Sequence, residues 1–155
     1  MNSNHLSHFP VMVDEAISFL KPKNRKLYLD CTFGQGGYSK KILETADCNV
    51  FAVDRDQESE IYAQRMKEKF KSRFLFNIER FSNINLLMKK QNIKNMDGMI
   101  WDLGMSNTQL NNPQRGFSFS NDGPLDMRMD NVRSKLTAEI VINEYQESEL
   151  SDIFF

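Results

Sequence analysis

The sequence of 155 residues predicts an α/β fold in which helices cover an open, parallel sheet. Short apolar runs alternate with stretches in which apolar residues recur every three or four positions. A glycine-rich segment, 34–37, follows the first run, and the second run ends in Asp54, eighteen residues after Gly36. Strands that alternate with helices pair in parallel through right-handed crossovers, so their carboxyl ends meet at one edge of the sheet.

The N-terminal elements follow from apolar spacing and from glycine. Beginning at Pro10, apolar residues at positions 13, 16, 17 and 20 share one face of a predicted helix that ends near Lys21. Residues 27–31 are a short apolar run typical of a buried strand. The glycines of 34–37 then predict a turn that leads into a second amphipathic helix.

The middle of the chain predicts three more strands. Residues 49–54 form the second apolar run, after which Tyr62, Met66 and Phe70 recur at four-residue spacing on a charged helix. A third strand is expected at 74–76, a helix at 84–88 and a fourth strand at 98–103.

The chain changes character after the fourth predicted strand. Residues 104–133 are rich in Asn, Pro, Gly, Ser and Asp and have no periodicity, which predicts a long loop. Weak helical patterns follow at 138–145 and from Ser148 to Phe155, and no fifth strand is expected.

Composition excludes several classes of protein. The chain has 40% hydrophobic residues and a formal charge of -1, which excludes disorder as its main state. No run is long enough to span a membrane, and no secretory leader is expected. Cys31 and Cys48 match neither a zinc site nor a disulfide framework, which favours a reducing cytoplasm. With only His5 and His8, we expect no histidine-based nucleophile and no metal site.

The net charge conceals an uneven distribution. Residues 1–59 hold 7 basic and 8 acidic side chains, 60–94 hold 9 and 3, and 95–155 hold 4 and 10. A basic middle segment can bind a polyanion while the total stays near zero. The alternative is that this segment is simply a solvated helix face.

The strand ends predict a nucleoside site. Glycines allow close approach of the backbone, and Asp54 stands where such folds place the acid that accepts both ribose hydroxyls. Ser39 replaces the third glycine of a dinucleotide fingerprint, while acids at Asp30 and Asp54 suit a cationic cofactor with a ribose and no phosphate. S-adenosylmethionine has that combination. An NAD or flavin oxidoreductase on the same sheet is the alternative.

Several segments together resemble the RsmH (MraW) family of ribosomal RNA methyltransferases. They are residues 8–16, 30–39, 53–56, 102–110 and, above all, the unusual stretch 115–130. The resemblance extends from about His8 to Phe155. It implies a Rossmann-like class I S-adenosylmethionine methyltransferase sheet that is incomplete. Residues 1–110 would be the first half of the cofactor-binding domain, and residues 111–155 a loop and the beginning of an inserted helical domain that recognises RNA. Because family members are about twice as long, we expect the chain to stop inside that insert.

The resemblance also implies an activity and a set of site residues. The activity is methylation of the exocyclic N4 of a cytosine in 16S rRNA, in the decoding region of the small ribosomal subunit, by a cytoplasmic enzyme. Asp102 is the expected catalytic residue, and its role would be to orient the N4 amine of the cytosine. The cofactor contacts implied by the matching positions are Gly36, Gly37, Tyr38, Asp54, Phe81, Asp102 and Gln109.

Each of these assignments has a structural alternative. Phe81 could be a core aromatic instead of an adenine platform, and Asp102 could cap the following turn. Arg115 and Arg128 could contact RNA, or pair with acids of their own loop at 122, 126 and 130. Asn107 stands where a second serine is expected after Ser106. The whole chain could also be a remnant that binds cofactor without catalysis. We further expect the isolated chain to self-associate, because strand 98–103 would lie at an open edge.

Overall fold

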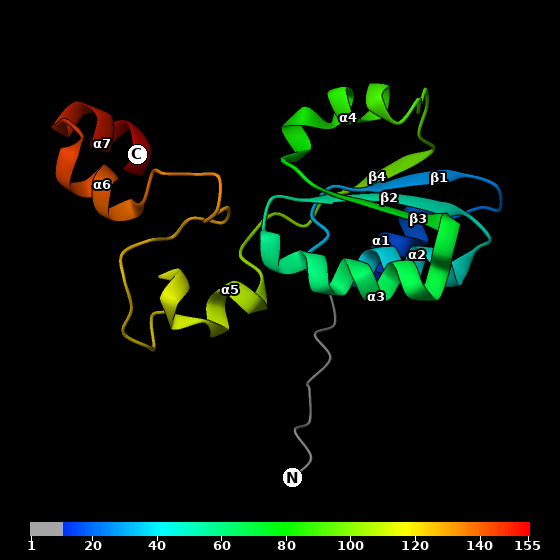
Figure 1. Cartoon of the computed structure of the whole chain (residues 1–155), viewed down its shortest axis with the longest axis horizontal. Coiled ribbons are helices and arrows are strands. Elements are labelled where there is room, and N and C mark those ends of the chain that lie inside the picture. The colour runs from blue at the N-terminus through cyan, green and yellow to red at the C-terminus, as the bar shows by residue number, and fades with distance from the viewer. Residues whose placement is uncertain (1–10) are drawn as a thin grey trace, which may run out of the picture. The chain divides into compact units, whose positions relative to one another are not determined.

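The computed structural model describes residues 11–155 (Figure 1). The first three residues of the motif at 8–16, the predicted helix start at Pro10 and both histidines lie outside the described residues. The chain divides after Gly104 into two compact units, here called the N-terminal and the C-terminal unit, and each is described by itself.

The N-terminal unit contains one parallel sheet of four strands in the order β3-β2-β1-β4. The strands are β1 (Leu27–Asp30), β2 (Asn49–Asp54), β3 (Phe74–Ile78) and β4 (Gly98–Ile100). All four lie where the sequence predicts them, which confirms the α/β class. The fourth is shorter than predicted, because residues 101–103 leave the sheet.

Helices cover both faces of this sheet. On one face lie α1 (Val13–Leu20), α2 (Gly37–Thr45) and α3 (Glu60–Phe70), and on the other lies α4 (Ile84–Lys90) (Figure 1). Single turns of 3-10 helix at Gln57–Ser59, Lys71–Arg73 and Phe81–Asn83 join helices and strands. The predicted helices of this unit are therefore confirmed.

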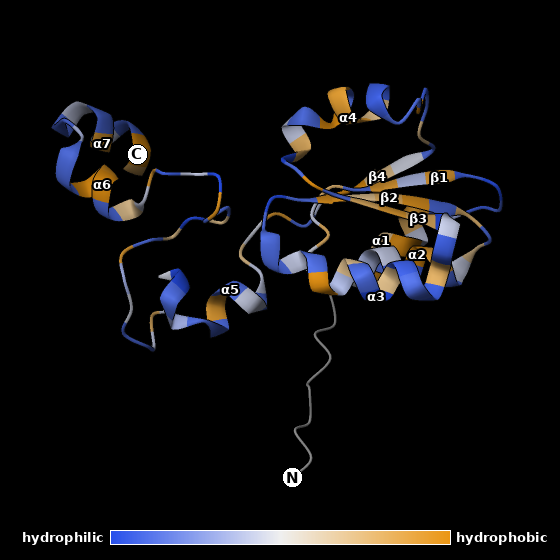
Figure 2. Cartoon of the chain, in the orientation of Figure 1, coloured by the Kyte–Doolittle hydropathy of each residue, from blue (hydrophilic) through white to orange (hydrophobic). Residues whose placement is uncertain are grey.

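The strands are buried on both faces, as expected for a parallel sheet. Alternate residues of β2 point to opposite sides: Val50 joins the larger core under α1, α2 and α3, and Phe51 joins the smaller core under α4. Phe33, from the glycine loop, packs its ring 4.9 Å from that of Phe76 in the larger core. Figure 2 shows the apolar strands between helices whose outer faces are polar. The loop after β1 thus contributes Phe33 to the larger core.

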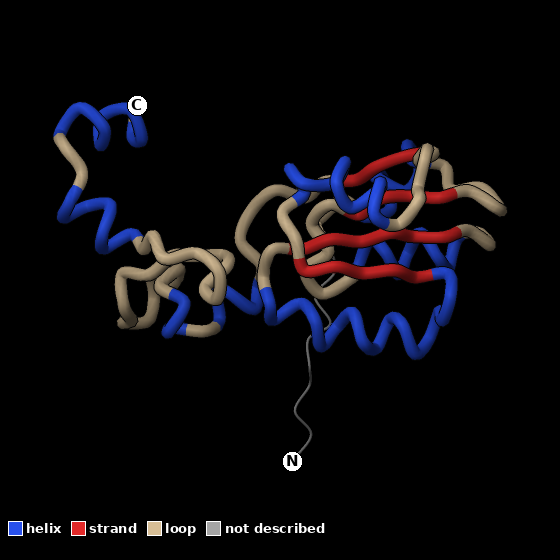
Figure 3. Tube along the Cα trace, turned by 45° about the horizontal axis from the view of Figure 1, so that its top comes forward, coloured by secondary structure: helices blue, strands red, loops and turns tan. Residues whose placement is uncertain are grey.

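The C-terminal unit is mostly loop (Figure 3). It contains α5 (Asn107–Asn111), a 3-10 turn at Pro113–Arg115, α6 (Ala138–Glu144) and α7 (Glu147–Phe154). The last two helices were predicted. The prediction of a continuous loop over 104–133 is wrong at α5, which is too short to show periodicity. Among the described residues, no helix combines the length and the apolar character needed to cross a bilayer.

Candidate functional site

The carboxyl ends of the strands are joined by hydrogen bonds that fix the glycine loop. The Phe33 N–H donates to the carbonyl of Val53 at 3.1 Å, and the Cys31 N–H to that of Ile100 at 3.0 Å. Further along, the Asp102 N–H donates to Oγ1 of Thr32 at 2.8 Å. The loop after β1 is therefore held against the ends of both neighbouring strands.

Asp54 closes β2 with its carboxylate held by backbone donors. Its Oδ2 accepts from the Gly34 N–H at 2.6 Å, and its Oδ1 from the Asp56 N–H at 2.9 Å. Burial raises the pKa of Asp54, although these N–H groups and that of Arg55 favour the ionised form. A carboxylate offers about four lone-pair positions. Asp54 thus keeps acceptor capacity for hydroxyl groups.

Asp30 behaves differently although it ends the adjacent strand. The residue is 0% exposed, and its oxygens accept from the Thr32 N–H at 3.3 Å and from Oγ of Ser39 at 2.7 Å. Burial raises the pKa of Asp30 to about 6. Asp30 therefore ties β1 to α2 from inside, and the expected direct attraction of a cationic cofactor to this carboxylate does not fit its burial.

The glycine turn brings backbone to the open edge. Gly36 has φ of 83°, and a Cβ there would stand 2.7 Å from the ring of Phe33. α2 begins at Gly37, and its N-cap residue, Gly36, has no side chain that could accept from the first N–H groups. Tyr38 is buried, and its hydroxyl donates to the Val11 carbonyl. Burial raises the pKa of Tyr38, with smaller contributions from Asp102 and Asp30. What Tyr38 offers a ligand is thus chiefly its main chain at a helix N-terminus.

Phe81 lies just beyond β3, whose exit is tied to that of β2 by a hydrogen bond of 2.8 Å from the Glu79 N–H to the Asp54 carbonyl. Its side chain is 42% exposed and belongs to neither core cluster. The alternative that Phe81 is a core aromatic is therefore wrong.

Asp102 is exposed two residues beyond β4. The next helix, α5, is capped by Ser106. The alternative that Asp102 caps the turn directly after it stays a prediction. Its backbone is fixed by Thr32, while its side chain is open to solvent.

Gln109 lies in the C-terminal unit. It is 3% exposed, and its Oε1 accepts from the Ser106 N–H at 3.0 Å while its own N–H donates to Oγ of Ser106 at 3.2 Å. This reciprocal pair is a capping box. The other six expected site residues belong to the N-terminal unit.

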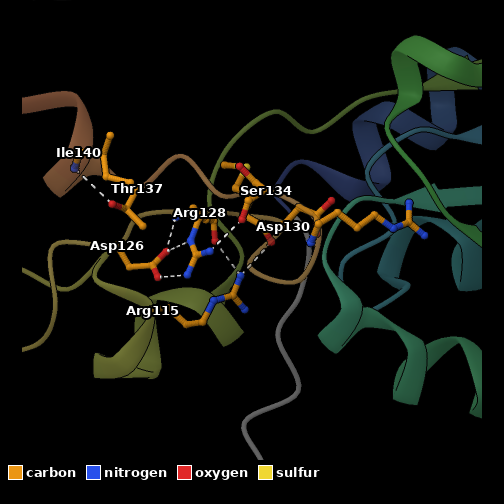
Figure 4. Close-up of polar contacts among 9 residues, drawn as sticks. Arg115, Asp126, Arg128, Asp130, Ser134, Thr137 and Ile140 are labelled. Carbon is orange, nitrogen blue, oxygen red and sulfur yellow. Dashed lines mark hydrogen bonds and ion pairs between the residues drawn. The ribbon is translucent and has the colours of Figure 1, made fainter. Parts of the chain in front are cut away.

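The loop that follows is held by its own arginines (Figure 4). Arg128 makes paired hydrogen bonds with Asp126, from Nε to Oδ1 at 2.9 Å and from Nη2 to Oδ2 at 2.5 Å. This partner holds the pKa of Asp126 below its usual value. Arg115 is 2% exposed and donates to the carbonyls of Arg128 and Met129 at 3.1 and 2.9 Å. The alternative of pairing within the loop is confirmed for Arg128 and Asp126.

The sequence did not assign a structural role to the residues that hold the loops within each unit. Thr32 and Ser39 fasten the glycine loop, and Gly116 and Gly123 allow the backbone of the C-terminal loop to pack on itself. A Cβ at Gly116 would lie 2.4 Å from the Pro124 carbonyl oxygen, and one at Gly123 2.1 Å from that of Pro113. The signals in the sequence were the two family-like segments 30–39 and 115–130, the second of which has an unusual composition.

Comparison with known proteins identifies the family. Residues 5–155 match the model of the MraW methylase family. The chain belongs to this family. Its four-stranded parallel sheet with flanking helices is consistent with an incomplete Rossmann-like methyltransferase fold, as the sequence predicted.

Three similar relatives carry the same name, ribosomal RNA small subunit methyltransferase H. The protein of Rickettsia bellii is 47% identical over 148 residues, which are 96% of this chain and 47% of the relative. That of a Wolbachia species from Drosophila simulans is 43% identical over 150 residues, 97% of this chain and 51% of the relative. That of Ehrlichia ruminantium is 40% identical over 148 residues, which are 96% of this chain and 49% of the relative. The chain thus spans about half the length of the curated relatives it matches.

Proposed function

We propose that this chain is the N-terminal portion of a cytoplasmic S-adenosylmethionine-dependent methyltransferase. Its reaction is methylation of N4 of a cytosine in the decoding region of 16S rRNA. The observation that carries the proposal is the anchored Asp54 carboxylate, held by the Gly34 N–H at 2.6 Å in the glycine loop that leads into α2. The names of the relatives support an rRNA substrate.

The residues at the sheet edge fit this cofactor, which supplies an electrophilic methyl group on a sulfonium. Asp54 retains the acceptors that ribose hydroxyls need. Gly36, whose φ of 83° suits glycine, and Gly37 would let the backbone approach the ligand closely. Phe81 offers an exposed ring for adenine. Tyr38 and Gln109 complete the proposed contacts.

The acceptor amine needs assistance from the protein. The N4 lone pair of cytosine is delocalised into the ring, so the amine must be aligned with the methyl group and its hydrogens must be accepted. Two observations support Asp102 in this role: its backbone is fixed by Thr32 and the residue is exposed. We assign to the Asp102 carboxylate and the carbonyls of Leu103 or Gly104 the hydrogen bonds that orient the amine. The base must leave its stack to reach them. Residues 1–110 then form the first half of the cofactor domain, and 111–155 begin an inserted domain for RNA.

Cofactor binding is tested by titrating S-adenosylmethionine into this chain in a calorimeter. Asp54→Asn keeps the shape and removes the charge, so we expect affinity to fall at least about tenfold, or about 1.4 kcal/mol. Asp14→Asn, at an exposed position on α1, is the matched control and keeps the parent affinity. Tighter binding of NAD than of S-adenosylmethionine would establish the oxidoreductase instead.

Catalysis is tested with labelled cofactor and small ribosomal subunits that lack the modification. We expect label in 16S rRNA, and we expect Asp102→Ala to reduce transfer by about 100-fold or more while cofactor affinity falls far less, because a residue that orients the amine contributes mainly to the chemical step. The same substitution in a full-length relative is the second arm. Undiminished transfer in that arm removes the role of Asp102. A chain that binds cofactor and transfers no label is a remnant.

A further inference from the structure

The two ends of the sheet carry opposite charge. In a parallel sheet with helical crossovers, every connection from a helix to the next strand returns to the amino ends of the strands. The segments before β1, β3 and β4 therefore lie at one edge, opposite the edge with Asp54 and Asp102. The carboxyl edge is acidic, and the amino edge is rich in Lys and Arg.

Exposed cations come to this amino edge from three separate connections. Within residues 11–155 they form no ion pair. We call them the amino-edge surface: Lys21, Lys23, Arg25, Lys67, Lys71, Lys89, Lys90 and Lys94. In the sequence they are split between two charge blocks, so the crossover topology, not the order of residues, gathers them.

Most of the nearby acids are already neutralised. The ion pairs that use them are Lys69 with Glu44 at 2.5 Å, Lys26 with Asp97 at 2.8 Å and Arg73 with Asp47 at 3.7 Å. The cations of the amino-edge surface therefore remain as excess positive charge.

Helix ends explain only part of this charge. Lys67, Lys89 and Lys90 lie in the last turns of α3 and α4, where cations stabilise the helix dipole. Lys23, Arg25 and Lys94 lie in connecting loops and contribute nothing of that kind. Lys23 and Arg25 precede β1, and Lys94 precedes its neighbour β4, so these three are the diagnostic members.

We propose that the amino-edge surface binds the phosphate backbone of an RNA, at a place separate from the cofactor edge. Strands are about 4.8 Å apart, so the four amino ends span roughly 14 Å, which is wide enough for several phosphates. The cations come from three connections and not from one long amphipathic helix, the usual element for lying on a membrane surface. The choice of RNA as the polyanion rests on the proposed function. The positive charge of the surface is independent of that function.

The test measures binding of this chain to a fluorescein-labelled RNA duplex of about 20 base pairs by anisotropy over a range of salt concentrations. The test variant is Lys23→Gln with Arg25→Gln and Lys94→Gln. The matched control is Lys40→Gln with Arg65→Gln and Lys135→Gln, which removes the same charge at exposed positions elsewhere. Circular dichroism and S-adenosylmethionine titration of both variants establish that the fold and the cofactor site are intact.

We expect the test variant to bind RNA about tenfold more weakly or worse, and the slope of log affinity against log salt to fall by about 2–3. The control should change affinity less than about twofold and the slope by less than about 1. Equal losses in both variants, or none, would overturn the proposal. So would a preference of the parent for vesicles containing phosphatidylserine over RNA, which assigns the surface to a membrane. If the parent chain does not bind S-adenosylmethionine, the proposed function is refuted. The difference in RNA binding between the test variant and the control can still be interpreted in that case.

Discussion

Asp30 and Asp54 end neighbouring strands, yet burial gives them different functions. Asp54 keeps part of its carboxylate at the sheet edge, whereas Asp30 is enclosed and bonded to Thr32 and Ser39. Sequence reasoning placed both acids correctly at strand ends. It could not separate them, because enclosure of Asp30 depends on how α2 and the glycine loop fold over β1.

Asp30 makes the stability of the chain depend on pH. Its pKa is about 6 in the folded chain against 3.8 for the ordinary group, so the folded state binds the proton more tightly. The stabilisation is therefore fully present below about pH 4 and is lost as the pH rises through about 6. Between about pH 4 and pH 7, the free energy of unfolding of the parent should fall by up to about 3 kcal/mol relative to that of Asp30→Asn, because the amide of the variant stays neutral. Urea unfolding at several pH values measures it.

The substitution suits this test because a serine hydroxyl both donates and accepts, so Ser39 can accept from the new amide. Asp152→Asn, on the exposed face of α7, is the control and should follow the parent. If Asp30→Asn shows the same pH dependence as the parent between pH 4 and 7, Asp30 is not the group responsible.

At the scale of elements, apolar runs predicted the strands well because a parallel strand is buried on both faces. The largest difference in length is at β4, which is three residues shorter than predicted, while β3 is two residues longer. The run continues to Leu103, but the chain leaves the sheet after Ile100, and the Asp102 N–H bonds to the side chain of Thr32. Helix α5 was missed because five residues show no period. Ser106 and Gln109 are the one local signal that could have located it.

The capping box makes α5 depend on a single hydroxyl. Ser106→Ala removes the acceptor for the Gln109 N–H, which typically costs about 1 kcal/mol. Opening of α5 should then become about fivefold more frequent. Hydrogen exchange of the peptide covering residues 105–112 measures this. Ser148→Ala, an exposed serine in α7 that caps nothing in the described residues, should leave that peptide unchanged. Equal exchange in Ser106→Ala and the parent would mean that the box does not hold the helix.

At the scale of the whole molecule, the sheet separates two kinds of chemistry. The cofactor edge was predictable, because glycines and acids at strand ends are local features of the sequence. The amino-edge surface was not, because Lys23, Arg25 and Lys94 come together only through the strand order. Blocks of charge counted along the chain placed the excess in residues 60–94, whereas the fold assembles it from three connections.

The same strand order leaves β4 at an edge of the sheet in the described chain. β4 pairs with β1 on one side, and Met99 and Trp101 are 48% and 50% exposed. An edge with unpaired backbone groups and apolar side chains is a template for pairing between copies. We therefore expect this 155-residue chain to self-associate, with a mean mass in light scattering that rises with concentration.

Met99→Lys places a charge on that edge, which should shift association to at least about tenfold higher concentration, because like charges oppose edge pairing. Phe19→Lys is the control. Phe19 is 87% exposed but lies on α1, so its replacement tests nonspecific association through exposed apolar side chains instead of strand pairing. Equal effects of the two substitutions would assign association to apolar exposure alone. A parent chain that stays a monodisperse monomer in solution scattering at every concentration would contradict the prediction that this edge drives association.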